Sequence, residues 1–385
     1  MSILPDDFTL LQVTPELETG GAEQTTIDVA HGVIAQGGRA LVATKGGRMA
    51  ARLEADGGRL AQMPAQSKNP LIMLGNAARL IDLIRREKVS LVHARSRAPA
   101  FSALWAAHAT KVPFVATYHG VYNAKSNLKR WYNAVMTKGD LVIANSEYTR
   151  AHVIAEHGVP ADRVVAIPRG VDLTRFEPGL VSAERIKALR DAWGVQAEDR
   201  RLKVLLAGRL TRWKGQALVI EAMARLKAIS DTRILLLLVG DDQGRKAYRA
   251  ELEHMIAQAG LQDSVRLVGH CDDMPAAYLL ADFALAPSLE PEAFGRTALE
   301  PQAVGRPVLA ADHGGARETV ADGETGWLIE PGDVAAWTEA MAGLLEAGPG
   351  DWTRMGRAGQ ARARRLYSVG GMTDATLALY ASLLR

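Results

Sequence analysis

Short, nearly uninterrupted apolar runs alternate with longer amphipathic segments along the chain, and this alternation restricts the fold more than any other feature of the sequence. Six apolar runs in the first half are predicted as strands: residues 8–13, 40–44, 90–94, 114–118, 141–144 and 164–167. Helical periodicity lies between them, for example over residues 22–35, 72–87 and 147–156. Continuous apolar runs are typical of strands buried on both faces, and strands that alternate with helices form parallel sheets covered on both sides.

The same alternation begins again after a charged interval without strand-like runs, residues 172–200. The second set of predicted strands covers residues 202–207, 234–239, 265–268, 283–286, 307–310 and 326–329. The sequence therefore predicts an α/β protein with two Rossmann-like doubly wound domains and a linker near residues 170–180. A ligand of such domains is expected at the carboxyl ends of the strands, in a cleft.

The composition agrees with a globular protein of this size. A chain of 385 residues, 48% apolar and 23% charged, is long enough for two packed domains. The single cysteine, Cys271, excludes an intramolecular disulfide framework and fits a reducing compartment. No apolar run approaches the roughly 20 residues needed to cross a bilayer, and residues 3–11 lack the features of a signal peptide. We expect a cytoplasmic protein, with the inner face of the cytoplasmic membrane as a second location.

Charge is distributed unevenly between the two halves. Residues 1–170 contain 20 Lys and Arg against 14 Asp and Glu, whereas the remainder contains 26 against 29. A basic first domain favours anionic lipid surfaces or acidic acceptors, although simple scatter explains the difference equally well. Residues 125–138 combine basic side chains, among them Lys125 and Lys129, with a helical apolar stripe that includes Trp131 and Tyr132. The stripe is interpreted first as packing on the sheet and second as an interfacial helix.

The chemistry is concentrated in residues 287–300, Pro-Ser-Leu-Glu-Pro-Glu-Ala-Phe-Gly-Arg-Thr-Ala-Leu-Glu. A helix that begins near Gly295 has unpaired N–H groups in its first turn, so an anion can bind against the backbone of Phe294 to Thr297. Glu292 and Glu300 lie on either side, and carboxylates accept hydrogen bonds from hydroxyl groups. A diphosphate flanked by a sugar and a ribose fits this pattern, which is the description of a nucleotide sugar.

This spacing, Glu292 and Glu300 with Ala293-Phe294-Gly295 after the first, resembles the paired-glutamate signature of the retaining glycosyltransferases of family 4, which have the GT-B fold. Further motifs agree in the same order: Gly20-Gly21-Ala22-Glu23, Tyr118-His119-Gly120, Gly170-Val171-Asp172, Gly208-Arg209, Lys214-Gly215 and Gly314-Gly315-Ala316-Arg317-Glu318. The resemblance covers essentially the whole chain. It implies an acceptor-binding domain over residues 1–172, a nucleotide-sugar-binding domain over residues 173–367, and a last helix, residues 368–385, that returns to the first domain.

The resemblance also implies roles for individual residues. Arg209 and Lys214 would stabilise the leaving diphosphate, and fixed cations at that position suit its growing negative charge. His119 would lie near the donor sugar and the acceptor, Glu292 would bind the donor sugar's hydroxyls, and Glu300 the ribose. The other implied donor-binding residues are Gly20 and Gly21 in the first loop, Gly269 and His270 at the nucleobase, and Ala293, Phe294, Gly295, Arg296 and Thr297 at the helix start.

Several residues have simpler interpretations or depart from the family pattern. His93 is interpreted as a packed histidine before a functional one, Glu23 as a first-turn helix charge, and Arg212 as a candidate helper of the cation pair. Pro301 replaces the usual Ala and is expected to make its helix begin late or kink, because proline lacks an N–H group. Arg169 stands where Asn is common, with unknown effect. No metal site and no cofactor are expected.

The predicted function is transfer of a sugar, with retention, from a nucleoside-diphosphate sugar to an acceptor hydroxyl without a metal. A UDP-sugar is the favoured donor and GDP-mannose the alternative. The acceptor is expected to be a glycan or glycolipid, with lipopolysaccharide core or another cell-envelope glycan as the first choice, and a nucleic-acid partner is not expected. The alternatives are a nucleotide-sugar epimerase or a phosphorylase of the same fold, and a nonenzymatic protein that binds sugar nucleotides or membranes.

Overall fold

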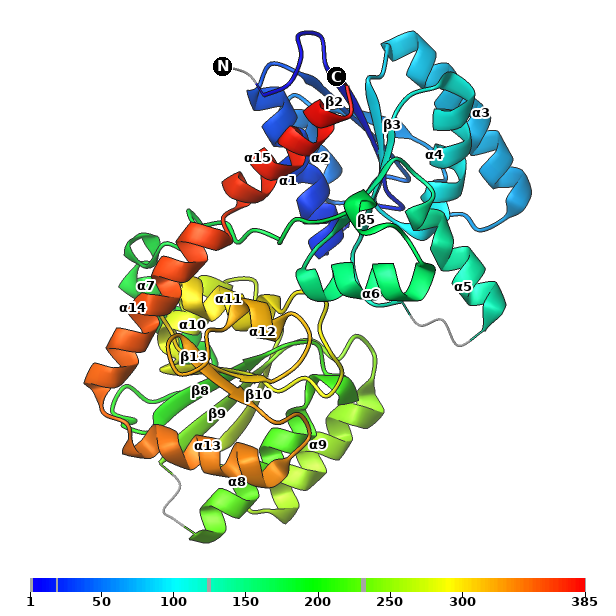
Figure 1. The fold of residues 1–385 in the computed structure, drawn as a ribbon. Coiled ribbons are helices and arrows are strands. Elements are labelled where there is room, and N and C mark those ends of the chain that lie inside the picture. The colour runs from blue at the N-terminus through cyan, green and yellow to red at the C-terminus, as the bar shows by residue number, and fades with distance from the viewer. Residues whose placement is uncertain (1–2, 19, 123–125, 230–232, 385) are drawn as a thin grey trace. The chain divides into compact units, whose positions relative to one another are not determined.

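The computed structural model describes residues 3–18, 20–122, 126–229 and 233–384 and consists of two compact units (Figure 1). Unit 1 comprises Met1–Gly170 and Val369–Arg385, and unit 2 comprises Val171–Ser368. Each unit is built on a parallel sheet covered by helices on both faces. The prediction of an α/β protein with two Rossmann-like domains and a returning C-terminal helix is confirmed.

The sheet of unit 1 has seven parallel strands in the order β3-β2-β1-β4-β5-β6-β7. The strands are β1 (Thr9–Val13), β2 (Arg39–Thr44), β3 (Arg59–Gln62), β4 (Leu91–Ala94), β5 (Phe114–Tyr118), β6 (Leu141–Ala144) and β7 (Val164–Ala166). All six predicted runs form strands. The strand β3 was not predicted, because it lies at the edge of the sheet with both end residues exposed and so needs no continuous apolar run.

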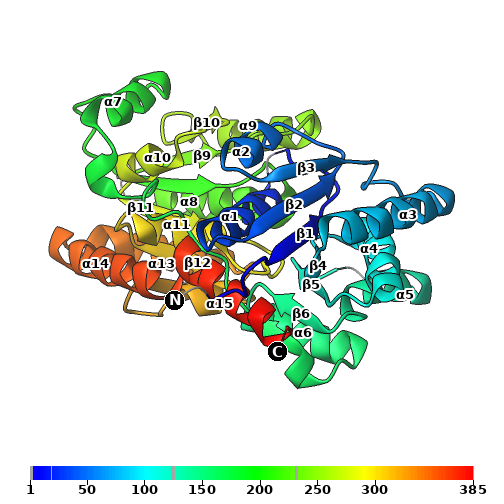
Figure 2. The same cartoon turned by 90° about the horizontal axis from the view of Figure 1, so that it is seen from above.

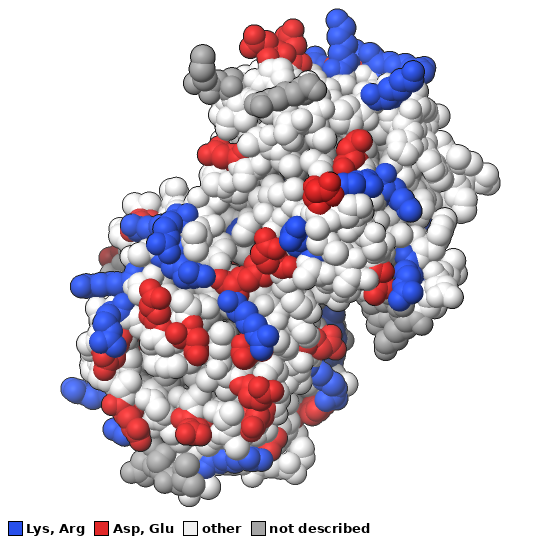
Figure 3. Space-filling view, viewed as in Figure 1, with Lys and Arg blue, Asp and Glu red and all other residues white. Residues whose placement is uncertain are grey.

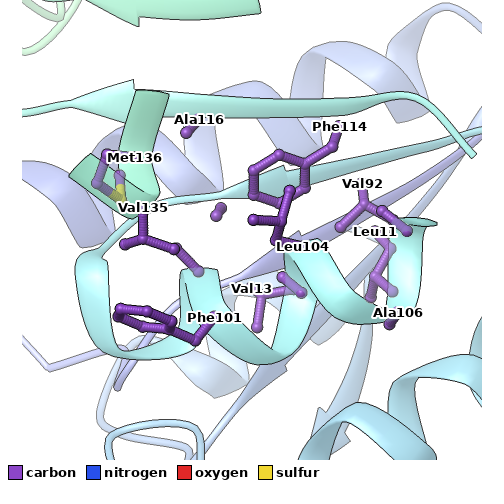
Figure 4. Packing of buried hydrophobic residues seen from close by; sticks show 14 of the residues in the cluster. Leu11, Val13, Val92, Phe101, Leu104, Ala106, Phe114, Ala116, Val135 and Met136 are labelled. Carbon is purple, nitrogen blue, oxygen red and sulfur yellow. The ribbon is translucent and has the colours of Figure 1, made fainter. Parts of the chain in front are cut away.

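Helices cover both faces of this sheet. They are α1 (Gly21–Ala35), α2 (Ala50–Ala55), α3 (Pro70–Glu87), α4 (Arg97–Thr110), α5 (Asn127–Ala134) and α6 (Glu147–His157), with short 3₁₀ helices η1 (Val135–Thr137) and η2 (Ala161–Arg163). Alternate residues of β1 enter different cores, since Leu11 packs with α3, α4 and η1 whereas Leu10 packs with α1. Figure 4 shows Leu104 of α4 directed toward Phe114 of β5, and Phe101 of the same helix beside Val135 of η1.

The last helix, α15 (Val369–Ser382), belongs to unit 1 and packs beside α1 (Figures 1 and 2). Its predicted apolar face is buried at Leu377 and Tyr380, and Tyr380 stacks on Phe8 with 6.2 Å between the ring centroids. A Cβ atom at Gly32 of α1 would lie 2.0 Å from Cγ2 of Thr373, so the glycine permits the close approach of the two helices. The C-terminal segment is thus part of the core of unit 1.

The sheet of unit 2 has six parallel strands in the order β10-β9-β8-β11-β12-β13. They are β8 (Leu202–Ala207), β9 (Ile234–Val239), β10 (Val265–Gly269), β11 (Phe283–Ala286), β12 (Val308–Ala311) and β13 (Gly326–Ile329), and each was predicted to within one residue. The strand order runs outward in both directions from the neighbours β8 and β11. Two such neighbouring strands form the topological switch point of an open α/β sheet, and ligands bind at their carboxyl ends.

Two apolar cores lie on the two faces of this second sheet. The helices of unit 2 are α7 (Ala183–Ala192), α8 (Gln216–Ile229), α9 (Lys246–Gln258), α10 (Met274–Leu280), α11 (Arg296–Ala303), α12 (Ala316–Thr319), α13 (Val334–Glu346) and α14 (Pro349–Leu366), with η3 (Pro178–Leu180) and η4 (Arg212–Lys214). Side chains of α8, α9 and α13 form one core, and those of α10, α11 and α14 form the other. Charges of both signs are interspersed over the face of unit 2 in Figure 3.

Pro301 does not delay its helix. The helix α11 begins at Arg296, directly after Gly295, and continues past Pro301 to Ala303, so the predicted late start is wrong. Gly295 has a φ of +84°, and this left-handed residue fixes the start of the helix independently of the proline. Within the described residues, no helix combines the length and the apolarity required to span a bilayer.

Candidate active site

The loop between β11 and α11 carries Glu292 and opens at the carboxyl end of β11, and Glu300 follows on α11. Gly295 is the N-cap of α11 without a side-chain cap, and the first turn contains no acidic residue. The N–H groups of Ala298 and Leu299 bond to the Gly295 carbonyl, at 3.0 and 3.1 Å. The N–H groups at the very start of a helix precede its first intrahelical bonds, so this end of α11 is chemically suited to an anion.

The glycines Gly314 and Gly315 pack directly against the backbone of this loop. The Gly315 N–H donates to the Glu292 carbonyl at 2.8 Å. A Cβ atom at Gly315 would lie 2.4 Å from Cα of Phe294, and one at Gly314 would lie 2.5 Å from the Glu292 carbonyl oxygen. No side chain fits between these segments. The Gly-Gly pair in the sequence therefore fixes the backbone position of Glu292.

One carboxylate oxygen of Glu292 accepts hydrogen bonds from three polar side chains. Its Oε1 accepts from Lys214 Nζ at 2.6 Å, from Ser288 Oγ at 2.5 Å and, more distantly, from Thr297 Oγ1 at 3.5 Å. The Lys214 and Glu292 side chains are only 11% and 16% exposed, so water screens this ion pair weakly. The residue predicted to bind the diphosphate and the residue predicted to bind the sugar thus contact each other directly.

Lys214 reaches Glu292 because β8 and β11 are neighbours in the sheet. It ends η4, its stem passes over Gly208, and its Nζ lies 4.4 Å from the centre of the Trp213 ring. Gly215 follows with a φ of +78°, and a Cβ atom there would lie 2.1 Å from the Pro287 carbonyl oxygen. The Lys-Gly motif therefore packs against the start of the glutamate loop, at the switch point of unit 2.

The two arginines near Lys214 differ in their surroundings. Arg209 is exposed, and its side chain forms no ion pair with any described residue, while its carbonyl accepts from Gln216 Nε2 at 3.0 Å. Arg212 forms an ion pair with Glu251, donating from Nη1 at 2.5 Å, and lies 5.1 Å from the centre of the Tyr248 ring. Arg209 therefore stays available to an anionic ligand, whereas the candidate helper Arg212 is already engaged.

Glu300 lies on α11 and pairs with the side chain of Arg296 one turn earlier. Arg296 donates from Nε and Nη2 to Oε1 of Glu300, at 3.0 and 2.7 Å. The Tyr278 hydroxyl is buried beside them, and burial together with the negative charge of Glu300 raises its pKa well above the ordinary range. The pair keeps the Glu300 carboxylate in a defined orientation while leaving it only 12% exposed.

Gly269 and His270 stand at the end of β10, as expected for residues that contact a ligand at this sheet edge. Gly269 has a φ of +80°, and its carbonyl accepts from the Gly240 N–H at 2.7 Å. The exposed His270 bonds from Nε2 to Asp272 Oδ1 at 2.8 Å. Across the described ranges, no cluster of three or more His, Cys, Asp or Glu is arranged to hold a metal ion.

In unit 1, His119 follows β5 and contacts Arg169. Arg169 Nη2 donates to His119 Nδ1 at 2.9 Å, while His119 Nε2 is buried without a hydrogen-bond partner among the described residues. Burial lowers the pKa of His119 well below its ordinary value, and the positive charges of Arg169 and Arg95 lower it further. His119 is therefore a neutral histidine with its proton on Nε2, and the Arg95 backbone is a hydrogen-bonding neighbour of its ring.

The loop before α1 contains Gly20 and Gly21. Gly20 is the N-cap, and the Glu23 carboxylate folds back over it, because a Cβ atom at Gly20 would lie 2.2 Å from Oε2 of Glu23. This position fits the interpretation of Glu23 as a first-turn helix charge. Thr19, just before the glycines, lies outside the described residues.

A buried polar network beneath His119 was not predicted. His93 contacts the hydroxyls of Tyr380, through Nδ1, and of Thr117, through Nε2 at 2.7 Å. Arg95 is 2% exposed and donates from Nε to Gln12 Oε1 at 2.8 Å. His93 thus has both ring nitrogens satisfied, in agreement with a packed histidine. The unpredicted Arg95 could have been inferred from its position directly after β4, since an arginine there faces the strand ends.

The structure thus gathers the predicted residues into separate groups. In unit 2, Lys214, Glu292 and Thr297 form one group and Arg296 with Glu300 another, with Phe294 buried beneath them against Tyr367. In unit 1, His119 lies with Arg169. Ser288 was missed, although its place in the same loop, four residues before Glu292, could have suggested it. Ala293 and Gly295 contribute backbone only.

Comparison with known proteins gives two family matches. Residues 19–175 match the model described as Glycosyltransferase Family 4, and residues 190–362 match Glycosyl transferases group 1. A glycosyltransferase of Rickettsia africae has a solved structure with a TM-score of 0.91 and 31% identity, covering 99% of this chain and 100% of that one. Anabaena HepE, solved in complex with UDP, has a TM-score of 0.84 and 25% identity, covering 97% and 100%.

Relatives with assigned activities match a shorter region. A D-inositol 3-phosphate glycosyltransferase of Pseudarthrobacter chlorophenolicus is 32% identical over 226 residues, which is 58% of this chain and 51% of that protein. A protein of the same name from Xylanimonas cellulosilytica is 32% identical over 234 residues, 60% of this chain and 54% of that protein. The chain spans about half the length of these curated relatives.

Proposed function

The chain belongs to glycosyltransferase family 4, and we propose that it is a retaining glycosyltransferase that moves a sugar from a UDP-sugar to an acceptor hydroxyl. The observation that supports this most is the contact of Lys214 with Glu292 at the switch point of unit 2. A cation for the diphosphate and a carboxylate for the sugar hydroxyls stand side by side there, next to the open start of α11.

The proposed reaction follows from these groups. The leaving group is a diphosphate, and its charge grows as the bond to the anomeric carbon breaks. Lys214, once released from Glu292, would hold that charge together with the exposed Arg209 and the first-turn N–H groups of α11. Glu292 would exchange its hydrogen bonds from Lys214 and Ser288 for sugar hydroxyls, and Glu300 would accept from the ribose.

Retention is assigned to displacement on one face of the sugar ring. The acceptor oxygen bonds to the anomeric carbon on the face from which the phosphate oxygen departs, and the acceptor's proton passes to that departing oxygen. Glu292 accepts hydrogen bonds from Lys214 and Ser288 in this structure. We assign it the same accepting role toward the hydroxyls of the sugar, not the role of a nucleophile. Detection of a sugar covalently attached to Glu292 would overturn this assignment.

His119 is assigned to the acceptor-binding unit as a neutral donor. Its Nε2–H group can bond a hydroxyl of the donor sugar or of the acceptor, since Nδ1 is occupied by Arg169. Gly20 and Gly21, in the loop before α1, would present bare backbone to the donor, and Gly269 with His270 would contact the nucleobase. The favoured base is uracil because HepE, a relative with 25% identity, is solved with UDP.

The acceptor is proposed to be a cell-envelope glycan, with lipopolysaccharide core first and the phosphorylated acceptor named in the relatives second. Contact of unit 1 with an anionic inner-membrane surface is included in the proposal. It is supported by Leu128 and Trp131 of α5, which are 75% and 64% exposed, whereas Val135 and Met136 are buried. Lys125, one of the basic residues of the same region, lies outside the described residues.

Calorimetric titration with UDP and with GDP, each with and without EDTA, tests the donor site first. We expect UDP to bind and EDTA to leave its affinity unchanged.

A transfer assay on the Lys214→Ala variant tests the phosphate assignment. Sugar transfer from a panel of UDP-sugars should be lost in this variant while its circular dichroism spectrum stays that of the wild type, because the charge of the leaving group then lacks its cation. Lys187→Ala is the matched control, since Lys187 pairs with Asp191 on the surface of α7. Full turnover in Lys214→Ala would refute the assignment.

A further inference from the structure

An arginine and a glutamate on α11 pair in the order that helices favour least. Arg296 is the first residue of α11, and Glu300 follows one turn later. A cation in the first turn meets the positive end of the helix dipole, and a cation that precedes its carboxylate at this spacing forms the weaker of the two possible pairs. Local helix energetics therefore do not account for Arg296, and its contacts indicate another role.

The guanidinium group of Arg296 contacts only one oxygen of the Glu300 carboxylate. Its Nε and Nη2 both donate to Oε1, at 3.0 and 2.7 Å, and Oε2 receives neither of these bonds. A carboxylate oxygen accepts about two hydrogen bonds, so Oε1 is occupied and Oε2 is the oxygen open to a ligand hydroxyl. Two bonds from one rigid plane also restrict rotation of the carboxylate.

A buried tyrosine lies beside the same carboxylate. Tyr278 belongs to α10, which neighbours α11 (Figure 1), and it is 1% exposed. Its ring shares an apolar core with Ala298 and Leu299 of α11. The Tyr278 hydroxyl is a hydrogen-bonding neighbour of Glu300, although no described group meets it with the distance and angle of a full hydrogen bond. Tyr278 therefore limits movement of the carboxylate toward the interior of unit 2.

Water compensates this carboxylate weakly. The Glu300 side chain is 12% exposed, against 40% for Arg296. Solvent cannot readily replace a bond that is lost at a nearly buried acceptor, so an acceptor without its donor is costly there. A site built to bond a ligand hydroxyl rejects an analogue that lacks it for this reason. The carboxylate of Glu300 is thus suited to discriminate between ligands, provided that its orientation is fixed.

Resting on the proposed transferase function, in which Glu300 accepts from the ribose, we propose that Arg296 is a positioning residue that makes the donor site selective for ribonucleotides. Arg296 holds Oε1 of Glu300, and Oε2 then accepts from the ribose hydroxyls, with Tyr278 on the buried side. Sugars carried by a 2′-deoxyribonucleoside diphosphate lack one of these hydroxyls and are poor donors. The selection acts on the pentose and not on the base.

Direct binding of the diphosphate is the competing role for Arg296. Its partly exposed guanidinium group stands at the start of α11, where an anion is expected. The two roles differ in what the loss of Arg296 does. Loss of a positioning residue weakens only ligands that carry ribose hydroxyls, whereas loss of a phosphate contact weakens every diphosphate alike.

Calorimetric titration with UDP and with 2′,3′-dideoxy-UDP separates these roles. We expect the wild type to bind UDP at least about tenfold more tightly than the dideoxy ligand, since bonds to a charged acceptor are lost. In Arg296→Met this preference should fall to about threefold or less, while the affinity for dideoxy-UDP stays that of the wild type. Arg249→Met is the matched control, because Arg249 precedes Glu253 by the same spacing on α9 and donates from Nε at 2.9 Å.

Arg296→Lys separates the charge of the side chain from its shape. Lysine keeps the positive charge but lacks the planar pair of donors, so only part of the preference for UDP should return. This variant also decides the question if Arg296→Met loses the circular dichroism spectrum of the wild type.

Two further measurements show whether Arg296 acts through Glu300. In Glu300→Ala the preference for UDP should be lost, and addition of Arg296→Met should change it no further. With a UDP-sugar as donor, Arg296→Met should raise KM and leave kcat within about twofold, because the ribose is bound equally in the ground state and the transition state.

The outcomes distinguish this proposal from the proposed function. If UDP binds but the wild type does not prefer it to dideoxy-UDP, or if Arg296→Met keeps the preference or weakens both ligands equally, the positioning role is wrong while the donor site stands. Absence of UDP binding would instead refute the proposed function.

Discussion

Arg169 donates from Nη2 to Nδ1 of His119 at 2.9 Å, and this contact determines the protonation of the histidine. A guanidinium group has no acceptor, so Nδ1 must carry the lone pair and Nε2 the proton. Arg169 also stands where the family commonly has Asn. In this chain the departure therefore supplies a fixed positive charge beside His119 as well as a hydrogen bond.

The first prediction concerns the pH dependence of Arg169→Met. In the wild type, the pKa of His119 is held well below 6.5 by burial and by Arg169 and Arg95. Loss of Arg169 removes one of these effects, so the pKa of His119 rises toward its ordinary value. We expect the acid limb of the kcat/KM profile to move to higher pH in Arg169→Met, because His119 is then protonated closer to neutrality. The activity lost relative to the wild type should therefore shrink as pH increases.

Profiles of kcat/KM between pH 5 and 9 measure this shift, and an NMR titration of the histidine ring reports the pKa directly. Arg163→Met is the control, since Arg163 bonds to the Asp140 carbonyl at 3.3 Å elsewhere in unit 1. An equal loss at every pH would show that Arg169 only supports the structure.

The second prediction concerns coupling between Lys214 and Glu292. Removal of either partner leaves a largely buried charge unpaired, whereas removal of both leaves none. We expect Lys214→Met and Glu292→Gln each to destabilise unit 2, and the double variant to be more stable than the sum predicts, with a coupling of about 1 to 3 kcal/mol. Denaturant unfolding of the four proteins measures this cycle. Additive effects within error would mean that the contact contributes little.

Most strands could be predicted because burial on both faces demands a continuous apolar run. The run Ile-Leu-Leu-Leu-Leu-Val became β9, and every residue of that strand is buried. The edge strand β3, Arg-Leu-Ala-Gln, has no such requirement and was missed. Helix α7 was also missed, because none of its residues is fully buried and its short apolar stripe, Ile186 and Leu189, stands among charged residues. Apolar sequence patterns reflect burial, so strands at a sheet edge and helices on the surface are hard to predict from them.

The site was predictable in its residues but not in its contacts. Glu292 and Glu300 were proposed from chemistry and spacing, and Arg209 and Lys214 from the family resemblance. The bond between Lys214 and Glu292, however, joins residues 78 positions apart. Only the adjacency of β8 and β11 brings them together, and sheet order is not encoded in local periodicity. The network around Arg95 was missed for the same reason, since its partner Gln12 comes from β1.

The third prediction concerns Gly315→Ala. The new Cβ atom would lie 2.4 Å from Cα of Phe294, and backbone atoms cannot give way as a flexible side chain can. The loop that carries Glu292 must then move outward, so we expect UDP-sugar affinity to fall by about tenfold or more, as misplacement of a positioning group does. Gly343→Ala is the matched control, because Gly343 lies in α13 with open space around its Cβ position. Unchanged affinity in Gly315→Ala would contradict the proposed rigidity of the loop.

The fourth prediction concerns Tyr380→Phe in α15. The Tyr380 hydroxyl contacts His93 Nδ1 in the core of unit 1, and its removal leaves that nitrogen buried without this partner. The cost of an unsatisfied buried group is about 1 to 3 kcal/mol. We expect the free energy of unfolding of unit 1 to fall by that amount while UDP affinity stays unchanged. Tyr148→Phe is the control, because Tyr148 lies on α6 and takes no part in the two hydrogen bonds of His93.

The last prediction concerns stability in acid. His93 and His119 are buried in unit 1, and burial lowers the pKa of each well below 6.5. The unfolded chain binds protons at these residues near pH 6.5, whereas the folded chain does so only at lower pH. Their contribution is therefore fully present above pH 6.5 and is lost as pH falls from there through the folded-state pKa values, by up to about 1.4 kcal/mol per pH unit and histidine. Urea unfolding of unit 1 between pH 5 and 7.5 should show this decline, and His119→Gln should make it shallower, because one group that takes up a proton on unfolding is then absent. A stability that is flat across this range would mean that the two histidines already accept protons in the folded protein.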